Sequence, residues 1–219
     1  MKKGIFVAGN DTNVGKTWVA CALLRNLRRA GVDAVGFKPF ACGDRLDAER
    51  LATAADGVEP VDQVNPVWFR APLSPFAASL VEQRHVDTAL AEETFHALAQ
   101  RHDCVIVEGV GGWEVPITQT IRMSDFAIHC DLPVLLVAAD RLGVQNHTIL
   151  TINAIRRAGL PVLGVLLNQA SPPLPMEMDP SPMTNQAVLE MLLDVPVWGP
   201  LLYECEDLPA EMLPVLDPP

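Results

Sequence analysis

The chain has 219 residues, of which 49% are hydrophobic and 20% are charged. This length and composition predict a globular protein that forms a single α/β domain over residues 1–219, with little room for two full domains. The formal net charge of −11 argues against nucleic acid or an anionic membrane surface as a partner. The few positive side chains therefore matter more, and the sequence has only four lysines, at positions 2, 3, 16 and 38.

The five cysteines are odd in number and include no Cys-x-x-Cys pair. This predicts a reduced, intracellular protein without a disulfide framework or a zinc site. Two N-terminal lysines followed by an apolar run look superficially like a signal peptide. The run ends at Asn10, which is too early for such a signal, and no later segment is long enough to span a bilayer. We therefore expect a cytoplasmic protein with no membrane partner.

The first predicted strand, residues 4–8, leads into a glycine-rich loop, residues 9–17 (GNDTNVGKT), and then into an amphipathic helix over 17–30. In this context, backbone N–H groups of the loop and the positive end of the helix bind phosphate. Lys16 is expected to reach the β- and γ-phosphates of a nucleotide, and the Thr17 hydroxyl to bind Mg²⁺. The loop has one residue more between its two glycines than the strict P-loop pattern.

Strands and helices alternate in the next part of the chain. A short strand over residues 34–38 ends at Pro39, and a helix over 47–55 follows. Residues 56–75 are rich in Pro and Asp and lack a regular period, so they are expected to be irregular. Two helices follow, over 74–82 and 88–101. Asp87 is the expected N-cap of the second, and three apolar residues of that helix are expected to face inward: Ala91, Phe95 and Leu98.

Two apolar runs, residues 104–107 and 133–138, are typical of parallel strands that are buried on both faces. Further helices are predicted over 145–158 and 183–193, and further strands over 162–167 and around Val197. A proline-rich loop covers 171–182, and a proline-rich tail begins at about residue 208. The alternation predicts a mostly parallel, doubly wound sheet with helices on both faces and the glycine-rich loop at the end of a central strand.

Carboxylate and hydroxyl oxygens are the ligands that Mg²⁺ prefers beside phosphates. Glu108 follows the strand over 104–107, at the edge where open α/β sheets bind ligands, and is the best carboxylate candidate. Beside a phosphate site its charge is expected to be repelled, so that neutralising it should cost no stability. Asp47 is either a second carboxylate ligand or an ordinary helix cap. Lys38 is either a cation of the phosphate site or a solvated side chain.

Two later segments are further candidates. The glycines at 109, 111 and 112 lack Cβ atoms, so they either let backbone amides approach a small ligand or form a plain tight turn. Asn168, which follows the strand over 162–167, either reads the edge of an adenine or closes a turn.

These motifs together resemble the dethiobiotin synthetase family of P-loop NTPases. The similarity extends in the right order from Ile5 to about Leu202. Related ATPases of the partitioning and nitrogenase-iron-protein type carry a second lysine early in the loop, where this chain has Asn10-Asp11. The segments that carry the resemblance are residues 9–17, Lys38-Pro39, residues 108–112, Val115-Pro116-Ile117, and Leu142-Gly143 through Asn146-His147.

The resemblance implies an ATP- and Mg²⁺-dependent ligase of biotin biosynthesis. In that family, CO₂ (or bicarbonate) carboxylates one amine of 7,8-diaminononanoate to a carbamate, which attacks the γ-phosphate of ATP. The second amine then displaces phosphate and closes the ring of dethiobiotin. Lys16, Lys38 and Mg²⁺ would neutralise the two anions, and Thr12 would hydrogen-bond the carbamate. A homodimer with the substrate site near its interface is also implied.

The resemblance assigns the other residues of the site as well. The metal ligands would be Thr17, Asp47 and Glu108. The nucleotide would contact Asn13, Val14, Gly15, Lys16, Thr17, Asp47, Glu108, Gly111, Asn168, Pro200, Leu201 and Leu202. The substrate would contact Thr12, Lys38, Cys42, Gly109, Val110, Gly111 and Gly112, together with Leu142, Gly143, Val144, Gln145 and Asn146 of the neighbouring subunit.

Three residues depart from the family pattern: Asn13 replaces a common Glu, Cys42 a substrate-contacting Ser, and Arg141 a common Lys. They bear on substrate affinity and identity more than on the reaction class. Two other functions remain as alternatives. One is a partitioning-type ATPase that switches partner binding, and the other is an amide-forming ligase of the cobyrinate-synthase type, which usually carries a glutaminase domain.

Overall fold

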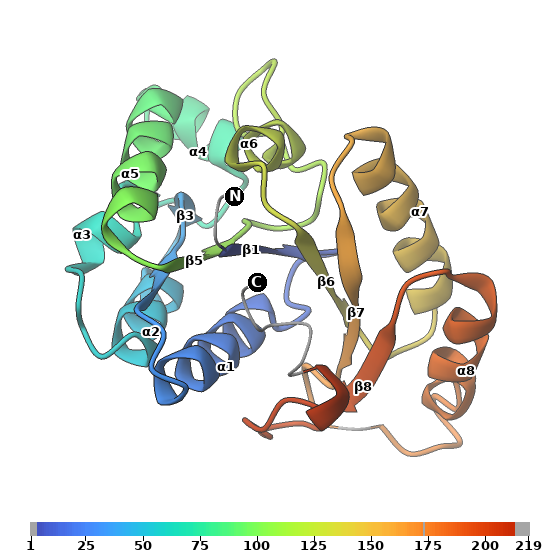
Figure 1. The fold of residues 1–219 in the computed structure, drawn as a ribbon. Coiled ribbons are helices and arrows are strands. Elements are labelled where there is room, and N and C mark those ends of the chain that lie inside the picture. The colour runs from blue at the N-terminus through green and yellow to red at the C-terminus, as the bar shows by residue number, and fades with distance from the viewer. Residues whose placement is uncertain (1–3, 173, 213–219) are drawn as a thin grey trace.

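The computed structural model describes residues 4–172 and 174–212. Its centre is a sheet of six parallel strands in the order β2-β5-β1-β6-β7-β8 (Figure 1). The predicted parallel sheet is therefore confirmed, with the strand before the glycine-rich loop near its middle. The strands are β1 (Gly4–Gly9), β2 (Ala34–Phe37), β5 (Cys104–Glu108), β6 (Val134–Ala139), β7 (Val162–Asn168) and β8 (Val197–Leu201).

Helices cover both faces of this sheet, as predicted (Figure 1). One face packs against α1 (Lys16–Arg29) and α2 (Leu46–Ala54). The other face packs against α5 (Thr88–Arg101), α6 (Met123–Cys130), α7 (Val144–Arg157) and α8 (Pro182–Leu192). The short helix α4 (Pro75–Val81) lies on that second side, and a 3-10 turn, η1 (Ala210–Met212), on the first.

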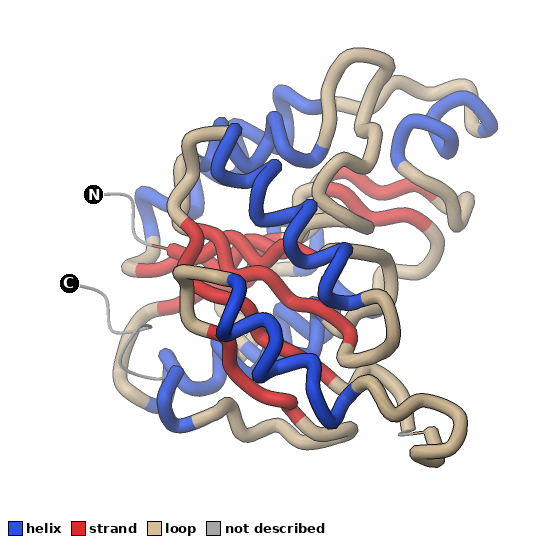
Figure 2. The backbone as a smooth tube through the Cα atoms, turned by 90° about the vertical axis from the view of Figure 1, so that its right-hand side faces the viewer, coloured by secondary structure: helices blue, strands red, loops and turns tan. Residues whose placement is uncertain are grey.

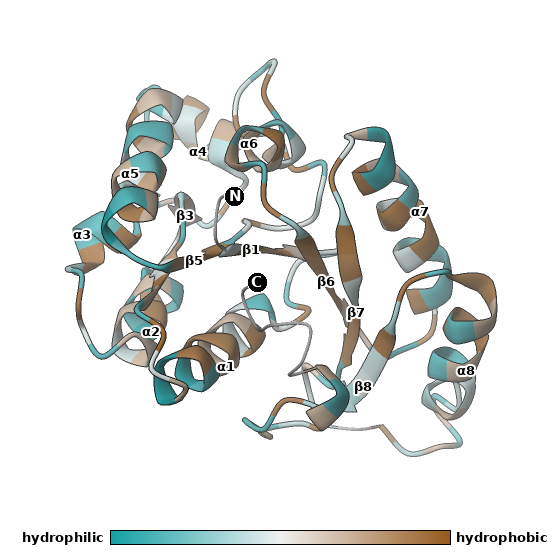
Figure 3. Cartoon of the chain, viewed as in Figure 1, coloured by the Kyte–Doolittle hydropathy of each residue, from teal (hydrophilic) through white to brown (hydrophobic). Residues whose placement is uncertain are grey.

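Each strand supplies apolar side chains to both hydrophobic cores, because successive side chains of a strand point to opposite faces. In β1, Phe6 and Ala8 join the core under α5 to α8, whereas Ile5 and Val7 join the core under α1 and α2. Figure 3 shows β1, β5, β6 and β7 as hydrophobic and the outer faces of the helices as largely hydrophilic. Burial on both faces explains why the strand sequences are unbroken apolar runs.

A second, small sheet was not predicted. It pairs β3 (Phe40–Cys42) with β4 (Val67–Phe69) in parallel and lies apart from the central sheet (Figure 2). The prediction that residues 56–75 are irregular is wrong for β4 and for the short helix α3 (Val61–Val64). Elements of three or four residues are too short to show a hydrophobic period, and their pairing depends on partners distant in sequence.

The helix α6 was not predicted from the sequence either. It has eight residues, and its N-cap position is occupied by Arg122, which is not one of the usual capping residues. By contrast, α5 has the predicted bounds, and the Asp87 side chain accepts a hydrogen bond of 2.9 Å from the backbone N–H of Leu90. Its predicted inward residues are buried: Ala91, Phe95 and Leu98.

None of the helices in the described part of the chain is both long and apolar enough to cross a bilayer. The proline-rich tail lies partly outside the described residues, which end at 212.

Candidate active site

The glycine-rich loop connects β1 to α1, as the sequence predicts. β1 ends at Gly9, α1 begins at Lys16, and Gly15 occupies the N-cap position with φ of +90°. A Cβ atom on Gly15 would lie only 2.0 Å from the side-chain nitrogen of Asn168. That amide lies at the end of β7 and donates a hydrogen bond of 2.8 Å to the carbonyl of Val14. Asn168 therefore holds the loop in place.

We expect Gly15→Ala to destabilise the protein and to weaken nucleotide binding, because it adds a clash with Asn168 to the strain of a left-handed backbone. That strain alone costs about 1–2 kcal/mol. The matched control is Gly31→Ala, because Gly31 has a similar φ of +82° but a Cβ atom added there would meet nothing within 4 Å. Thermal unfolding of both variants checks the prediction, and equal losses of melting temperature would contradict it.

Three neighbouring strands place the charged residues together. Glu108, the last residue of β5, lies beside Val7 of β1. On the other side of β5, Phe37 of β2 lies beside Val107, so Lys38 follows directly next to Glu108. The carboxyl ends of parallel strands meet at one edge of the sheet, where the glycine-rich loop also begins.

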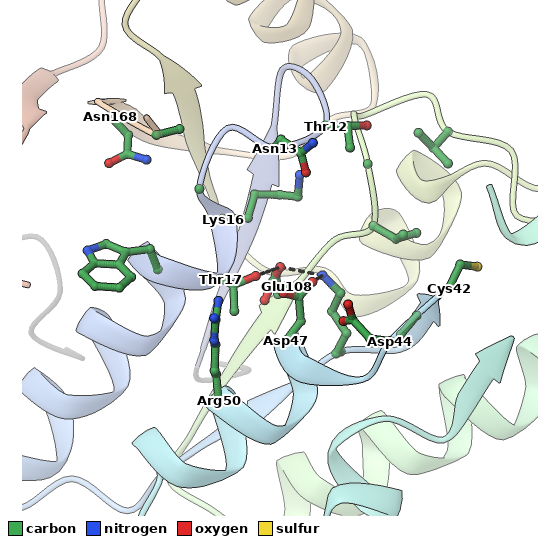
Figure 4. Close-up of a pocket in the computed structure, with 18 of the residues that line it drawn as sticks. Thr12, Asn13, Lys16, Thr17, Cys42, Asp44, Asp47, Arg50, Glu108 and Asn168 are labelled. Atoms are coloured by element: carbon green, nitrogen blue, oxygen red, sulfur yellow. Dashed lines mark hydrogen bonds and ion pairs between the residues drawn. The ribbon is translucent and has the colours of Figure 1, made fainter. Parts of the chain in front are cut away.

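The lysine, the glutamate and two further residues form a buried network. Lys38 Nζ donates to Glu108 Oε1 at 2.5 Å and to Asp47 Oδ2 at 2.9 Å. The Thr17 hydroxyl donates to the same Glu108 oxygen at 2.7 Å, and Figure 4 shows Thr17, Glu108 and Asp47 converging at the centre of the site. Glu108 and Lys38 are only 1% and 3% exposed. Glu108 is thus paired with a cation, so the premise that its charge is repelled does not hold in this structure.

The opposite charges in this network stabilise the ionised forms of one another. Burial has the largest effect on the pKa of Lys38 and lowers it, but Glu108 and Asp47 outweigh burial, and the pKa lies above its usual value. Burial likewise raises the pKa of Asp47, but the Lys38 ammonium outweighs it, so that this pKa lies below its usual value. Lys38 is therefore charged at neutral pH.

Lys16 is in a different electrostatic state. Its side chain is 6% exposed, and its ammonium donates a hydrogen bond of 3.2 Å to the carbonyl of Asp11. Burial, followed by the nearby charge of Lys38, lowers the pKa of Lys16 to about 8. A bound polyphosphate would favour the charged form and raise this pKa again.

We therefore expect nucleotide binding to take up protons near pH 8.5 and the affinity to fall as the pH rises above about 8, because the free protein loses the Lys16 charge in this range. Calorimetry in two buffers with different ionisation enthalpies measures the uptake. No uptake, with an affinity that is equal at about pH 7 and about pH 9.5, would contradict the prediction.

The network opens into a cavity of about 950 Å³. Figure 4 shows that Thr12 and Asn13 reach it from the loop, Asn168 from one end and Cys42 from the other. Burial, followed by Glu82, raises the pKa of the Cys42 thiol to about 11, so this group is neutral. Of the residues predicted for the site, the cavity is lined by Thr12, Asn13, Gly15, Lys16, Thr17, Lys38, Cys42, Asp47, Glu108, Val110, Gly111, Asn168 and Leu202.

Other predicted residues do not line this cavity, although the structure describes all of them. Pro200 and Leu201 line a separate cavity of about 480 Å³ beside β8, which Leu202 also borders. Val14, Gly109 and Gly112 belong to the surrounding loops. The segment Leu142, Gly143, Val144, Gln145 and Asn146 lies at the start of α7, outside the cavity of its own chain.

The segment at the start of α7 is nevertheless tied to the phosphate loop. Arg141 donates a hydrogen bond of 3.1 Å to Asp11 Oδ2. The buried side chain of Asn185 on α8 donates to Asp140 at 2.8 Å and accepts from Gln145 at 3.1 Å. The Leu142 side chain is 80% exposed. This segment is therefore anchored by hydrogen bonds on both sides, while the Leu142 side chain faces solvent.

Several residues of the cavity were not predicted from the sequence, among them Trp18, Asp44 and Arg50. Arg50 could have been found, because it follows Asp47 by three residues on a predicted helix and therefore shares its face. The others required the tertiary structure.

The donor set is suited to a metal that binds together with phosphates. No group of three or more His, Cys, Asp or Glu side chains that could hold a metal occurs within the described residues. Glu108 Oε2 is buried without a hydrogen-bond partner in the described structure. Two carboxylates and a hydroxyl, completed by phosphate and water oxygens, are typical of Mg²⁺ sites in phosphoryl-transfer enzymes. Thr17, Asp47 and Glu108 therefore fit Mg²⁺.

Comparisons with known proteins find relatives along most of the chain. A family model described as an AAA domain matches residues 3–205. The ATP-dependent dethiobiotin synthetase of Akkermansia muciniphila is 41% identical over 211 residues, which cover 96% of this chain and 97% of that protein. The enzyme of the same name from Anaeromyxobacter dehalogenans (strain 2CP-C) is 48% identical over 194 residues, covering 87% and 85% of the two chains.

Solved structures share the fold. The septum site-determining protein MinD of Pyrococcus horikoshii, complexed with Mg-ADP, has a TM-score of 0.53 at 17% identity and covers 94% of this chain and 82% of its own. The signal recognition particle receptor FtsY of Elizabethkingia anophelis has a TM-score of 0.56 at 16% identity, and the match covers 99% of this chain and 65% of the FtsY chain. At these identities the likeness concerns the fold alone.

Proposed function

Because this chain belongs to the family of ATP-dependent dethiobiotin synthetases, we propose that it forms dethiobiotin from 7,8-diaminononanoate, CO₂ and ATP. The observation that carries the proposal is the network of Lys38, Glu108, Asp47 and Thr17 at the open side of the phosphate loop. It places a cation and candidate metal ligands beside Lys16, in a cavity with room for a nucleotide and a small substrate.

In the proposed reaction, CO₂ adds to one amine of the substrate and a proton leaves, which gives a carbamate. An oxygen of the carbamate bonds to the γ-phosphorus while the bond to ADP breaks. The second amine then attacks the carbamoyl carbon of the mixed anhydride, the bond to phosphate breaks, and the amine loses a proton. The ureido ring is closed, with ADP and phosphate as the other products.

The residues of the cavity would act by holding anions together. Two anions, the carbamate and the triphosphate, repel each other unless cations lie beside them. Lys16 would bind the β- and γ-phosphates, and Lys38 would lie between the γ-phosphate and the carbamate, with Thr12 donating to the carbamate. Mg²⁺, when bound by Thr17, Asp47 and Glu108, would supply further positive charge to the phosphate oxygens.

We include a homodimer and a cytoplasmic location in the proposal. The support for a dimer comes from the segment at the start of α7. The resemblance to the family assigns the segment Leu142–Asn146 to the substrate of a neighbouring subunit, and in agreement with this the segment does not line the cavity of its own chain. The backbone N–H of Leu142 donates to Asp179, and exposed apolar side chains occur in both segments: Leu142, Leu174, Met176, Met178 and Met183.

The test is phosphate release from ATP with and without its partner substrates. We expect release to depend on both diaminononanoate and bicarbonate, with dethiobiotin formed in equal amount. A partitioning-type ATPase would release phosphate without either compound, and an amide-forming ligase would require a different acid and an ammonia source. Either result would refute the proposed function.

A further inference from the structure

Arg50 of α2 faces the candidate phosphate site. It follows Asp47 by three residues, which places both side chains on one face of the helix. It lines the same cavity as Lys16 and Thr17. Figure 4 shows the Arg50 side chain rising from α2 with its guanidinium end close to Thr17, on the opposite side of Thr17 from Lys16.

Arg50 is an exposed side chain whose guanidinium has no direct partner among the described residues. In the part of the chain that the structure describes, Arg50 has neither an ion pair nor a hydrogen bond, even though the net charge of the whole sequence is −11. Lys38, another cation of the cavity, is bound to Glu108 and Asp47. Among the described cations that line the cavity, Lys16 and Arg50 therefore remain to attract an anionic ligand.

The balance of charges in the cavity explains why a second unpaired cation matters for binding an anionic ligand. Its lining carries four carboxylates, from Asp44, Asp47, Glu108 and Glu204, and three cations. A nucleotide triphosphate brings several further negative charges into this space. A guanidinium stays charged at all relevant pH values and presents a planar fork that matches two phosphate oxygens.

We propose that Arg50 binds the polyphosphate chain of the nucleotide, as a third cation beside Lys16 and the metal. The proposal rests on the proposed function only in taking this cavity as the nucleotide site. Arg50 lies beside Thr17, in the middle of the cavity between Asn168 and Cys42, so its ligand is the phosphate chain and not the base (Figure 4). The contribution of Arg50 to nucleotide affinity therefore grows with the number of phosphates in the nucleotide.

The test measures the dissociation constants of ATP, ADP and AMP with Mg²⁺ present and without diaminononanoate. We expect Arg50→Ala to weaken ATP binding about tenfold, which corresponds to about 1.4 kcal/mol, and to change AMP binding by less than about twofold. Arg50→Lys should restore part of the loss, because it keeps the charge but not the fork. The control is Arg29→Ala, which changes the net charge equally at the opposite end of α1 from the loop.

An Arg50→Ala variant that binds ATP as well as the parent protein, or that loses AMP and ATP affinity equally, would overturn the proposal. An equal loss of ATP affinity in Arg29→Ala would also overturn the proposal, because the weaker binding would then come from the change in net charge. Since no diaminononanoate is present, these outcomes are independent of the proposed reaction. If phosphate release proves not to need diaminononanoate, the proposed function fails while the role of Arg50 is still decided by the nucleotide affinities.

Discussion

Replacing Lys16 with alanine is expected to abolish dethiobiotin formation and phosphate release while leaving the protein folded. Lys16 lies at the start of α1, where its ammonium donates to the carbonyl of Asp11 within the loop and to none of the carboxylates in the described part of the chain. It is therefore available to the phosphates of a nucleotide. Loss of one preorganised group of this kind commonly lowers turnover by about 10²–10³-fold. Initial rates of phosphate release, with ATP affinity measured in parallel, check this expectation.

The stability of the Lys16→Ala variant distinguishes a role of Lys16 in phosphate binding from a structural role. In the folded protein the pKa of Lys16 is lowered from 10.5 to about 8, so the unfolded chain binds more protons between these two values and stability rises with pH across that window. At neutral pH the buried charge therefore costs on the order of 3 kcal/mol. Alanine removes this cost but also loses the packing of the aliphatic stem. We expect the nucleotide-free variant to melt no lower than the parent.

Near-normal turnover of Lys16→Ala would refute the assignment of the phosphate loop. A melting temperature several degrees below that of the parent would show instead that Lys16 holds the loop together.

The glycine-rich loop and the central sheet could be predicted because their signals are local. Apolar runs of strand length, separated by amphipathic helices, require only the neighbouring residues to be recognised. The position of Glu108 at a strand end likewise predicted its place at the ligand edge of the sheet, and the structure places it there.

Electrostatic state could not be predicted in the same way. Lys38 and Glu108 are 70 residues apart, and they meet because β5 lies between β1 and β2. Strand order is a tertiary property, so Glu108 was expected from the sequence to be a repelled anion, although Lys38 neutralises it. The small β3-β4 sheet was missed for the same reason, because its pairing joins segments 27 residues apart.

Replacing Glu108 with glutamine is expected to destabilise the nucleotide-free protein and to abolish turnover. Glutamine keeps the size of the side chain and can still accept from Thr17, but it removes the charge that pairs with buried Lys38. Breaking a buried pair costs about 3–5 kcal/mol, and we expect about 3 because Asp47 still pairs with Lys38. For a protein of this size, this lowers the melting temperature by roughly 6–12 °C.

Loss of stability alone does not show that Glu108 binds metal, so a matched variant is needed. Lys38→Met breaks the same ion pair from the other side and leaves both carboxylates, Glu108 and Asp47, without their cation. If these carboxylates are Mg²⁺ ligands, the lysine competes with the metal for them. Removing the lysine should then strengthen Mg²⁺ binding, whereas removing the Glu108 charge should weaken it.

Calorimetric titration of Mg²⁺ and thermal unfolding, both without nucleotide, distinguish the two roles of Glu108. We expect added Mg²⁺ to raise the melting temperature of Lys38→Met towards that of the parent protein, because a cation that binds only the folded state stabilises it. The same addition should leave Glu108→Gln unchanged, and its phosphate release should need more Mg²⁺ than that of the parent. If Mg²⁺ raises both melting temperatures equally, or neither, Glu108 is only the structural partner of Lys38 and the metal assignment is wrong.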